Sequence, residues 1–320
     1  MKLSIVQFYA LSLAWGILIV FASTSLRVLE KSPRSLTLEK KNSNSKHPKF
    51  VQTEVKKFEY LMQQDIKLAL EELAETYPQL VTFENSQERY GLPTAGGSSD
   101  CPFDDDVVGC KNYFITIEDK MSLDDRSAIP DVFLSGAVHG NERIGPTTVV
   151  ETAKLLLEAA ACEALPRPVG HISEEEKSNE VELATECRRS LSARGIFPWI
   201  RRWLARLAST RRIVVIPSAN AVGYYRNKRE EERIDPNRDF AFDQVNWSKC
   251  MQTIAARTIN ELFRDHIFQH SLTYHAGMVA IAYEWGAPSR NNPKGIPSPD
   301  EYVNFICWMR IFFTKLTINF

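Results

Sequence analysis

Hydrophobic residues in the middle of this chain form two patterns, short continuous runs and repeats of three or four residues. The places where one pattern gives way to the other mark the ends of the predicted elements. Short apolar runs predict strands, whereas apolar residues that recur every three or four positions predict helices. The predicted strands are residues 81–84, 113–117, 132–138, 212–217 and 271–275, and the predicted helices are residues 55–77, 144–159, 196–207 and 251–267. Because strands and helices alternate over residues 52–290, the sequence predicts a single α/β domain with a largely parallel sheet.

Three stretches show neither period and are predicted to be loops. Residues 91–109 are rich in Gly, Ser and Asp, residues 162–194 are charged and irregular, and residues 218–225 are rich in turn-forming residues. The chain contains no internal repeat. These loops connect elements of one domain, so the sequence predicts no further domain boundary inside it.

The start of the chain has the pattern of a targeting signal. One lysine precedes an apolar run from Ile5 to Ala22, and small residues follow that run. This pattern is typical of a secretory signal peptide over residues 1–24, with an uncleaved membrane anchor as the alternative. Residues 25–51 are polar and basic without periodicity, which predicts a linker. We therefore expect a secreted protein, or one that stays in the lumen of the secretory pathway.

Export would allow disulfides and glycosylation. Cys101 and Cys110 lie close together around the first predicted loop, and Cys162 and Cys187 could close the second. We expect disulfides between these cysteines in an exported protein, with free thiols in a reducing cell as the alternative. The sequon at Asn246 can be used only on the secretory route.

The overall charge bears on whether the protein binds nucleic acid or membranes. A net charge of −1 over 320 residues gives no electrostatic reason to bind nucleic acid or an anionic membrane. The helix predicted over residues 196–207 carries several arginines that could contact membrane or RNA. A solvated helix face is the simpler interpretation of that pattern, so we predict no nucleic-acid partner.

Two histidines and one glutamate lie where predicted strands end. His139 and Glu142 follow strand 132–138 on a turn that contains glycine, and His275 ends strand 271–275. A His-x-x-Glu pair alone is often incidental. Two His ligands and one Glu ligand, however, leave the fourth position of zinc open for water or substrate, which is the catalytic arrangement. The sequence therefore predicts one Zn²⁺ per chain, held by His139, Glu142 and His275.

A second group of polar residues lies in residues 226–240, which are dense in charge. Taken alone, this segment is best explained as an exposed loop whose charges compensate one another. The pair Asn237-Arg238 permits a sharper interpretation, because an amide and a guanidinium can hold a carboxylate at two points.

Three motifs together resemble a known family. The motifs are His139-x-x-Glu142, Asp235-Pro-Asn-Arg-Asp-Phe240, and Tyr274-His275 with Tyr283-Glu-Trp-Gly286 downstream. In this order they resemble the zinc metallocarboxypeptidases of the carboxypeptidase A/B type, over roughly residues 54–301. The resemblance implies a three-layer α/β/α sandwich on a mixed eight-stranded sheet, with a catalytic domain over residues 52–301.

The resemblance also implies roles for individual residues. It makes His139, Glu142 and His275 the zinc ligands and Asn237-Arg238 the clamp on the substrate's terminal carboxylate. Its transition-state arginine corresponds to Arg229, with Arg226 as the alternative because loop length varies there. The implied reaction is removal of C-terminal residues, so the implied partners are the C-termini of peptides or proteins. No specific membrane partner is expected beyond the N-terminal anchor.

The resemblance is incomplete toward the end of the chain. In the family, the general-base glutamate and the substrate-capping tyrosine lie beyond the position of Phe320, so we expect both, with the last strands and helices, to be missing. Residues 302–320 are apolar on all sides, which predicts an aberrant tail. Glu284 is a poor candidate for the base, since the resemblance gives it a structural position. His266 and His270 could form a metal pair on one helix, although a helix-end pair near solvent is favoured.

Three hypotheses follow. The first is a secreted zinc carboxypeptidase, whose activity in this chain is in doubt without the base. The second is an aspartoacylase-like zinc deacylase, which uses a similar set of residues. The third is a non-catalytic protein that binds zinc or peptide ends.

Overall fold

The computed structural model describes residues 59–104, 107–121, 131–164, 185–240, 249–277 and 282. The chain divides into two units, of which Tyr60–Ala280 contains every element described below and the other joins Met1–Glu59 to Ile281–Phe320. The predicted signal segment, the linker, the apolar tail, Asn246 and Tyr283-Glu-Trp-Gly286 lie outside the described residues.

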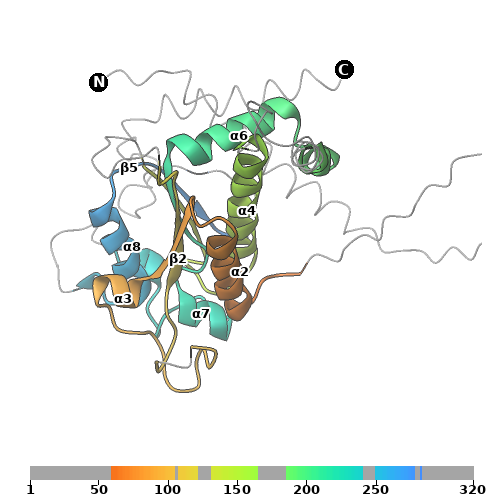
Figure 1. The fold of residues 1–320 in the computed structure, drawn as a ribbon. Coiled ribbons are helices and arrows are strands. Elements are labelled where there is room, and N and C mark those ends of the chain that lie inside the picture. Colours follow the sequence, from red (N-terminus) through yellow and green to blue (C-terminus); the bar gives the residue numbers. More distant parts are fainter. Residues whose placement is uncertain are drawn as a thin grey trace, which may run out of the picture. The chain divides into compact units, whose positions relative to one another are not determined.

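Within the described ranges, a five-stranded sheet forms the centre of the unit Tyr60–Ala280 (Figure 1). Its strands are β1 (Val81–Asn85), β2 (Tyr113–Ile117), β3 (Asp131–Gly136), β4 (Arg212–Ile216) and β5 (Phe268–Tyr274), in the order β1-β2-β4-β3-β5. Strand β3 runs parallel to β4 and β5, whereas β2 is antiparallel to β1 and β4. Four of these five strands therefore point the same way, which confirms the predicted mixed, mainly parallel sheet.

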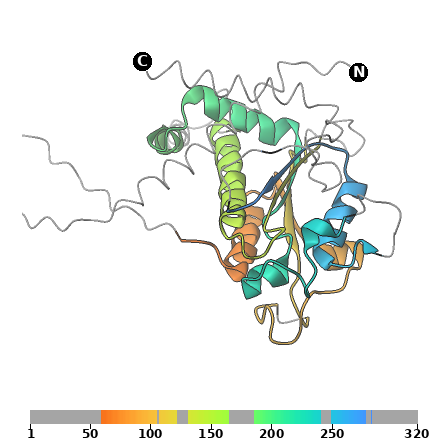
Figure 2. The same ribbon diagram turned by 180° about the vertical axis from the view of Figure 1, so that it is seen from behind.

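Helices cover both faces of this sheet (Figures 1 and 2). On one face, α2 (Gln63–Thr76) contacts β1 and β2, and α4 (Ile144–Ala164) contacts β3, β4 and β5. Helix α6 (Pro198–Thr210) packs against α4. The opposite face carries α3 (Ser86–Tyr90) and α8 (Ile254–Asp265). The arrangement is an α/β/α sandwich, as predicted.

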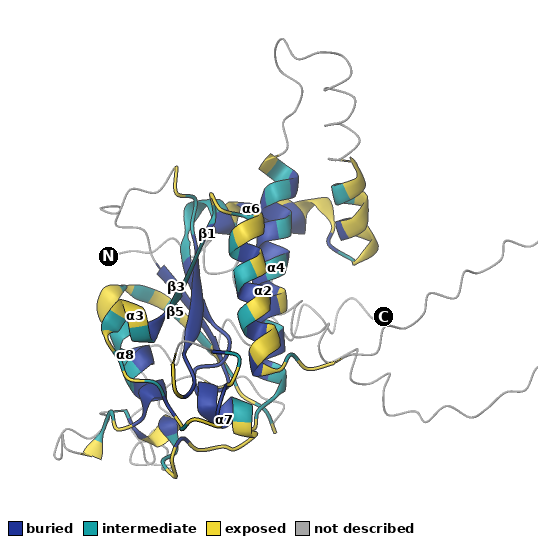
Figure 3. Ribbon diagram, turned by 60° about the horizontal axis from the view of Figure 1, so that its bottom comes forward, coloured by how far each residue is buried: buried dark blue, intermediate teal, exposed yellow. Residues whose placement is uncertain are grey.

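The core explains why the central strands are continuously apolar. Phe114, Phe133 and Val214 pack with Ile259 and Leu262 of α8 in one buried cluster. Successive side chains of a strand point to opposite faces, and both faces are covered, so all residues of β2 and β3 are buried (Figure 3). Full burial of each large apolar side chain contributes about 1.5–3 kcal/mol.

Several predicted boundaries were wrong. Helix α2 begins at Gln63, not near residue 55, and residues 59–62 are not helical. The Asp65 carboxylate accepts a hydrogen bond from the Met62 N–H at 2.9 Å, which satisfies one of the unpaired donors at this helix start. The irregular excursion predicted over residues 162–194 is partly helical, because α4 extends to Ala164 and residues 185–193 form a further helix.

Two further predictions needed correction. The loop predicted over residues 218–225 contains helix α7 (Ala221–Arg226), which Asn220 caps with its side-chain oxygen. His266 is the C-cap of α8 and His270 lies in β5, so the two histidines form neither a metal pair on one helix nor the helix-end pair that the sequence favoured. Strand β5 begins soon after α8, and this short connection separates the two histidines.

Both expected disulfides are present. Cys101 is bonded to Cys110, and Cys162 to Cys187. Two disulfides are compatible with an extracellular location. Among the residues that the structure describes, no helix combines the length and the hydropathy that a membrane span requires.

Candidate metal centre

The three predicted ligands come from the ends of two neighbouring parallel strands. His139 and Glu142 follow β3, and His275 is the first residue after β5. Strands β3 and β5 pair in parallel from Asp131 to Gly136, so their C-terminal ends meet at one edge of the sheet. This edge is where open α/β sheets usually carry their sites, and it brings together residues that lie 133 positions apart.

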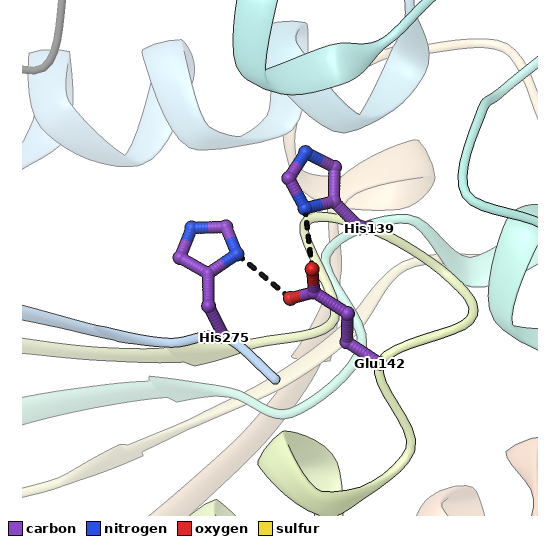
Figure 4. Close-up of side chains that lie close together, drawn as sticks. All are labelled: His139, Glu142 and His275. Carbon is purple, nitrogen blue, oxygen red and sulfur yellow. Dashed lines mark hydrogen bonds and ion pairs between the residues drawn. The ribbon is translucent and has the colours of Figure 1, made fainter. Parts of the chain in front are cut away.

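The three side chains converge on one point (Figure 4). His139 Nδ1 lies 2.8 Å from Glu142 Oε1, and His275 Nδ1 lies 2.7 Å from Glu142 Oε2. The two imidazole rings are 4.8 Å apart between centroids. One potential ligand atom from each residue lies within 4.8 Å of the others. This group could therefore hold a metal ion.

Access to the centre is one-sided. The side chains of His139 and Glu142 are 5% and 12% exposed, whereas that of His275 is 40% exposed. The Ala276 N–H also donates to Glu142 Oε2 at 3.0 Å. The carboxylate is thus held by the protein on one side, while solvent reaches the centre past His275.

Asp235 orients His139, a role that the sequence analysis did not assign to it. His139 Nε2 lies 3.0 Å from Asp235 Oδ1. If a metal ion replaced the contact between His139 Nδ1 and Glu142, an Nε2–H that donates to Asp235 would leave Nδ1 as the ligand nitrogen. The signal was present, because Asp235 lies two residues before Asn237 in the recognised motif, but local sequence does not reveal which histidine it contacts.

Arg229, not Arg226, lies beside this centre. Its Nε and Nη2 donate to Asp235 Oδ2 at 3.0 and 2.8 Å, and its Nη1 is 3.8 Å from Glu142 Oε1. Arg226 instead makes a two-point contact with Asp100 at 2.9 and 2.7 Å. Of the two arginines considered from the sequence, only Arg229 has its guanidinium near the candidate ligands.

Asn237 and Arg238 lie on a short 3₁₀ turn, η1 (Pro236–Arg238), and both are exposed. Asp235 Oδ1 accepts from the Asn237 N–H at 2.9 Å. The Arg238 guanidinium donates to the neighbouring Asn237 carbonyl at 3.0 Å. Within the described ranges no carboxylate forms an ion pair with Arg238, so its charge is presented to solvent.

Both carboxyl groups of the centre favour their ionised form. Burial opposes ionisation of Glu142, but hydrogen bonds from His139 and His275 outweigh it and hold the pKa of Glu142 below its usual value. For Asp235, burial is likewise outweighed by the hydrogen bond from Arg229 and the charge of His139, which lower its pKa. Glu142 is therefore an anionic oxygen donor at neutral pH.

The chemistry of these donors fits a zinc ion. Two imidazole nitrogens and one carboxylate oxygen form the His₂Glu set of catalytic zinc sites. Both Nδ1 atoms face the Glu142 carboxylate, so a cation between them would replace two hydrogen bonds. The contact between Asp235 and His139 supplies the outer-shell partner that metal-ligating histidines usually have.

Comparisons with known proteins find similarity in fold alone. No protein-family model and no curated protein matches the sequence. A thrombin activatable fibrinolysis inhibitor (TAFI) structure aligns with 13% identity and a TM-score of 0.48, over 82% of this chain and 57% of that one. Carboxypeptidase A from Helicoverpa armigera aligns with 15% identity and a TM-score of 0.45, over 78% and 52% respectively. The chain thus resembles metallocarboxypeptidases in fold and spans little more than half the length of either protein.

A third solved structure belongs to another group of proteins. An aspartoacylase family protein from Mesorhizobium loti aligns with 15% identity and a TM-score of 0.29, over 61% of this chain and 40% of that one. At such identities and scores the alignments carry no argument about activity, which has to come from the site itself.

Proposed function

We propose that this chain is a zinc-dependent metallocarboxypeptidase-type protein that acts on the C-terminal residue of peptides or proteins. The observation that carries the proposal is the convergence of two imidazole nitrogens on one carboxylate, with Arg229 beside them. The motif that contains Asn237 and Arg238 adds a means of recognising a chain end.

Each residue has a role in this proposal. A zinc ion bound by His139, Glu142 and His275 would polarise the scissile carbonyl and lower the pKa of a bound water. The Arg229 guanidinium would donate to the oxygen that becomes negative during attack. Asn237 and Arg238 would bind the terminal carboxylate, which restricts the reaction to chain ends. Asp235 would keep His139 in the tautomer that presents Nδ1.

The general base is assigned to none of the described residues. Both oxygens of Glu142 face imidazoles, and Asp235 is occupied by Arg229 and His139. Metal binding, peptide-end binding and turnover are therefore separate properties of this chain. The occupied oxygens of Glu142 and Asp235 favour a second candidate, a protein that binds zinc and peptide ends without hydrolysis.

The test measures all three properties on the purified full chain. Zinc content is measured after dialysis, and binding of a C-terminal peptide is measured by isothermal titration. Turnover is measured with a C-terminal reporter peptide, an amidated copy of it and an N-acetyl amino acid. We expect one zinc per chain and hydrolysis of the free-acid peptide only, lost with a chelator and restored by zinc. Zinc with peptide binding but no turnover would establish the binder instead. Hydrolysis of the N-acetyl amino acid alone would establish the deacylase. Absence of zinc would refute every zinc-dependent candidate.

A further inference from the structure

We propose that Asn220 is a positioning residue, which holds the main chain of Arg229 against the turn that carries His139 and Glu142. The inference deepens the proposed function, because it concerns how the transition-state arginine is placed. Asn220 itself touches neither the candidate ligands nor the guanidinium. It acts through the backbone.

The Asn220 side chain is completely buried and makes two directed hydrogen bonds. Its Oδ1 accepts from the Gly223 N–H at 2.8 Å, and its Nδ2 donates to the Arg229 carbonyl at 3.2 Å. The orientation of the amide follows from its partners, because an N–H can only donate and a carbonyl can only accept. A carboxylate of the same shape could keep the first bond but not the second.

The same residue reaches the metal-ligand turn. The Asn220 N–H donates to the Ala137 carbonyl at 2.9 Å, two residues before His139. The Arg229 carbonyl accepts a second hydrogen bond, from the Gly140 N–H at 3.2 Å, and Gly140 lies between His139 and Glu142. One carbonyl oxygen thus joins the arginine segment to both Asn220 and the ligand turn.

Backbone packing leaves no room for a side chain at Gly140 or Gly223. A Cβ on Gly140 would lie 2.0 Å from the Gly223 carbonyl carbon and 2.4 Å from the Lys228 carbonyl oxygen. A Cβ on Gly223 would lie 2.4 Å from Asn220 Nδ2. The ligand turn, α7 and the arginine segment therefore meet main chain to main chain, and only glycines permit that approach.

The hydrogen bonds to the Arg229 carbonyl matter because the side chain of this arginine is partly exposed. The Arg229 side chain is 43% exposed, and its side-chain partners are carboxylates of the same centre. The two-point contact with Asp235 orients the guanidinium, and the backbone of Arg229 sets the position from which the side chain reaches it. Without the Nδ2 donor, the Arg229 carbonyl would lose one of its two hydrogen bonds and keep only the one from Gly140.

The chain offers a matched control for the test. Asn85 is also buried and also caps a helix, since its Oδ1 accepts from the Glu88 N–H at 3.0 Å. Asp and Asn are equally good at helix N-caps. Asn85→Asp and Asn220→Asp therefore both keep a helix cap. Only Asn220→Asp loses the donor to the Arg229 carbonyl and places a carboxylate oxygen beside that carbonyl.

The first measurement needs neither metal nor turnover. Limited tryptic digestion of the full chain, with the sites mapped by mass spectrometry, reports how often the segment opens at Lys228 and Arg229. We expect Asn220→Asp to be cut there about tenfold faster than the parent, the factor for one lost hydrogen bond. Asn85→Asp should be cut at the parent rate.

The second measurement reports on the arginine itself. Isothermal titration of a phosphonate peptide into the zinc-loaded chain probes the oxyanion position, and we expect about tenfold weaker binding for Asn220→Asp. Zinc content should remain one per chain. Where turnover is present, kcat should fall while KM stays within about twofold, a division that general destabilisation does not produce.

Asn220→Ser and Asn85→Ser form a milder pair, because serine also caps helices. They replace the Asp variants if thermal unfolding shows that Asn220→Asp does not fold. Equal cleavage rates and equal phosphonate affinities in the two members of a pair would overturn the positioning role. A parent chain without zinc or peptidase activity would instead refute the proposed function, and the digestion would still decide the role of Asn220.

Discussion

The two ends of β3 carry similar groups with different properties. At its start, the Asp131 carboxylate contacts one imidazole, since His266 Nδ1 lies 2.9 Å from Asp131 Oδ2. At its end, Glu142 faces both His139 and His275, and Asp235 and Arg229 stand behind them. The partner strand β5 supplies one histidine to each end, since His266 precedes it and His275 follows it.

The difference shows what separates a structural pair from a candidate site. The His266 side chain is 11% exposed, stacks on Phe268 and contacts the Asp131 carboxylate, so each group of this pair has a partner. At the C-terminal end of β3, His139 and His275 both direct Nδ1 at the Glu142 carboxylate. The His275 side chain remains 40% exposed. A His–carboxylate contact alone says little, whereas convergence of several donors with access to solvent is the property that a metal needs.

The largest effect should come from removing a ligand at one end of β3. His275→Ala is expected to weaken zinc binding more than 100-fold, since changes in outer-shell partners alone cost about 10- to 100-fold. His266→Ala, at the other end, should leave zinc affinity unchanged. Competition with a fluorescent zinc chelator measures both, and equal losses in the two variants would remove the distinction between the ends.

The next largest effect concerns the carboxylate behind His139. Asp235→Asn keeps the size of the side chain but removes its charge, and we expect zinc affinity to fall by about 10- to 100-fold. Asp131→Asn serves as the control and should bind zinc as the parent does. An unchanged affinity in Asp235→Asn would show that the orientation of His139 does not depend on this contact.

For the free energy of unfolding, we expect His266→Ala to have a larger effect than His275→Ala. His266→Ala leaves the buried Asp131 carboxylate without its partner, and we expect a loss of about 1–3 kcal/mol in the free energy of unfolding. In metal-free protein, His275→Ala should cost less, because that side chain is much more exposed. Urea denaturation in the presence of a chelator tests this order, and the comparison fails if His275→Ala proves the more costly.

The end with the candidate site also contains backbone strain. Ala137, the first residue after β3, has a φ of 43°, a conformation that costs a residue with a Cβ about 1–2 kcal/mol. Ala137→Gly relieves this strain but loosens the unfolded chain, so we expect about 0.5 kcal/mol of stabilisation. Ala153→Gly in α4 is the control and should destabilise by about 1 kcal/mol, as measured by thermal unfolding.

The smallest effect is the dependence of stability on pH. The pKa of Glu142 is lower in the folded chain than in the unfolded chain because His139 and His275 donate to it. The unfolded chain therefore binds more protons, and the contribution of Glu142 is present above its unfolded pKa and lost as pH falls through its folded pKa. Glu142→Gln should flatten the stability profile of metal-free protein below pH 4.5, the ordinary value of the group. Parallel profiles for the parent and the variant would contradict the shift.

Local pattern accounts for much of what could be predicted. The strands at residues 113–117 and 212–217 were found almost to the residue, because continuous apolar runs mark strands buried on both faces. Boundaries failed where polar contacts decide them. Helix α7 lies in a stretch of turn-forming residues, and its start depends on the Asn220 cap. Helix α2 begins at Gln63, and the spacing of apolar residues does not indicate this start.

The sequence by itself determined the α/β class and the candidate ligand set, because periodicity and motif spacing are local properties of the chain. Tertiary structure alone decided that Asp235 lies against His139, 96 positions away, and that Arg229 lies at the centre while Arg226 lies against Asp100. The physical reason is that sheet register brings strand ends together. No local spacing records which side chains then come within hydrogen-bonding distance.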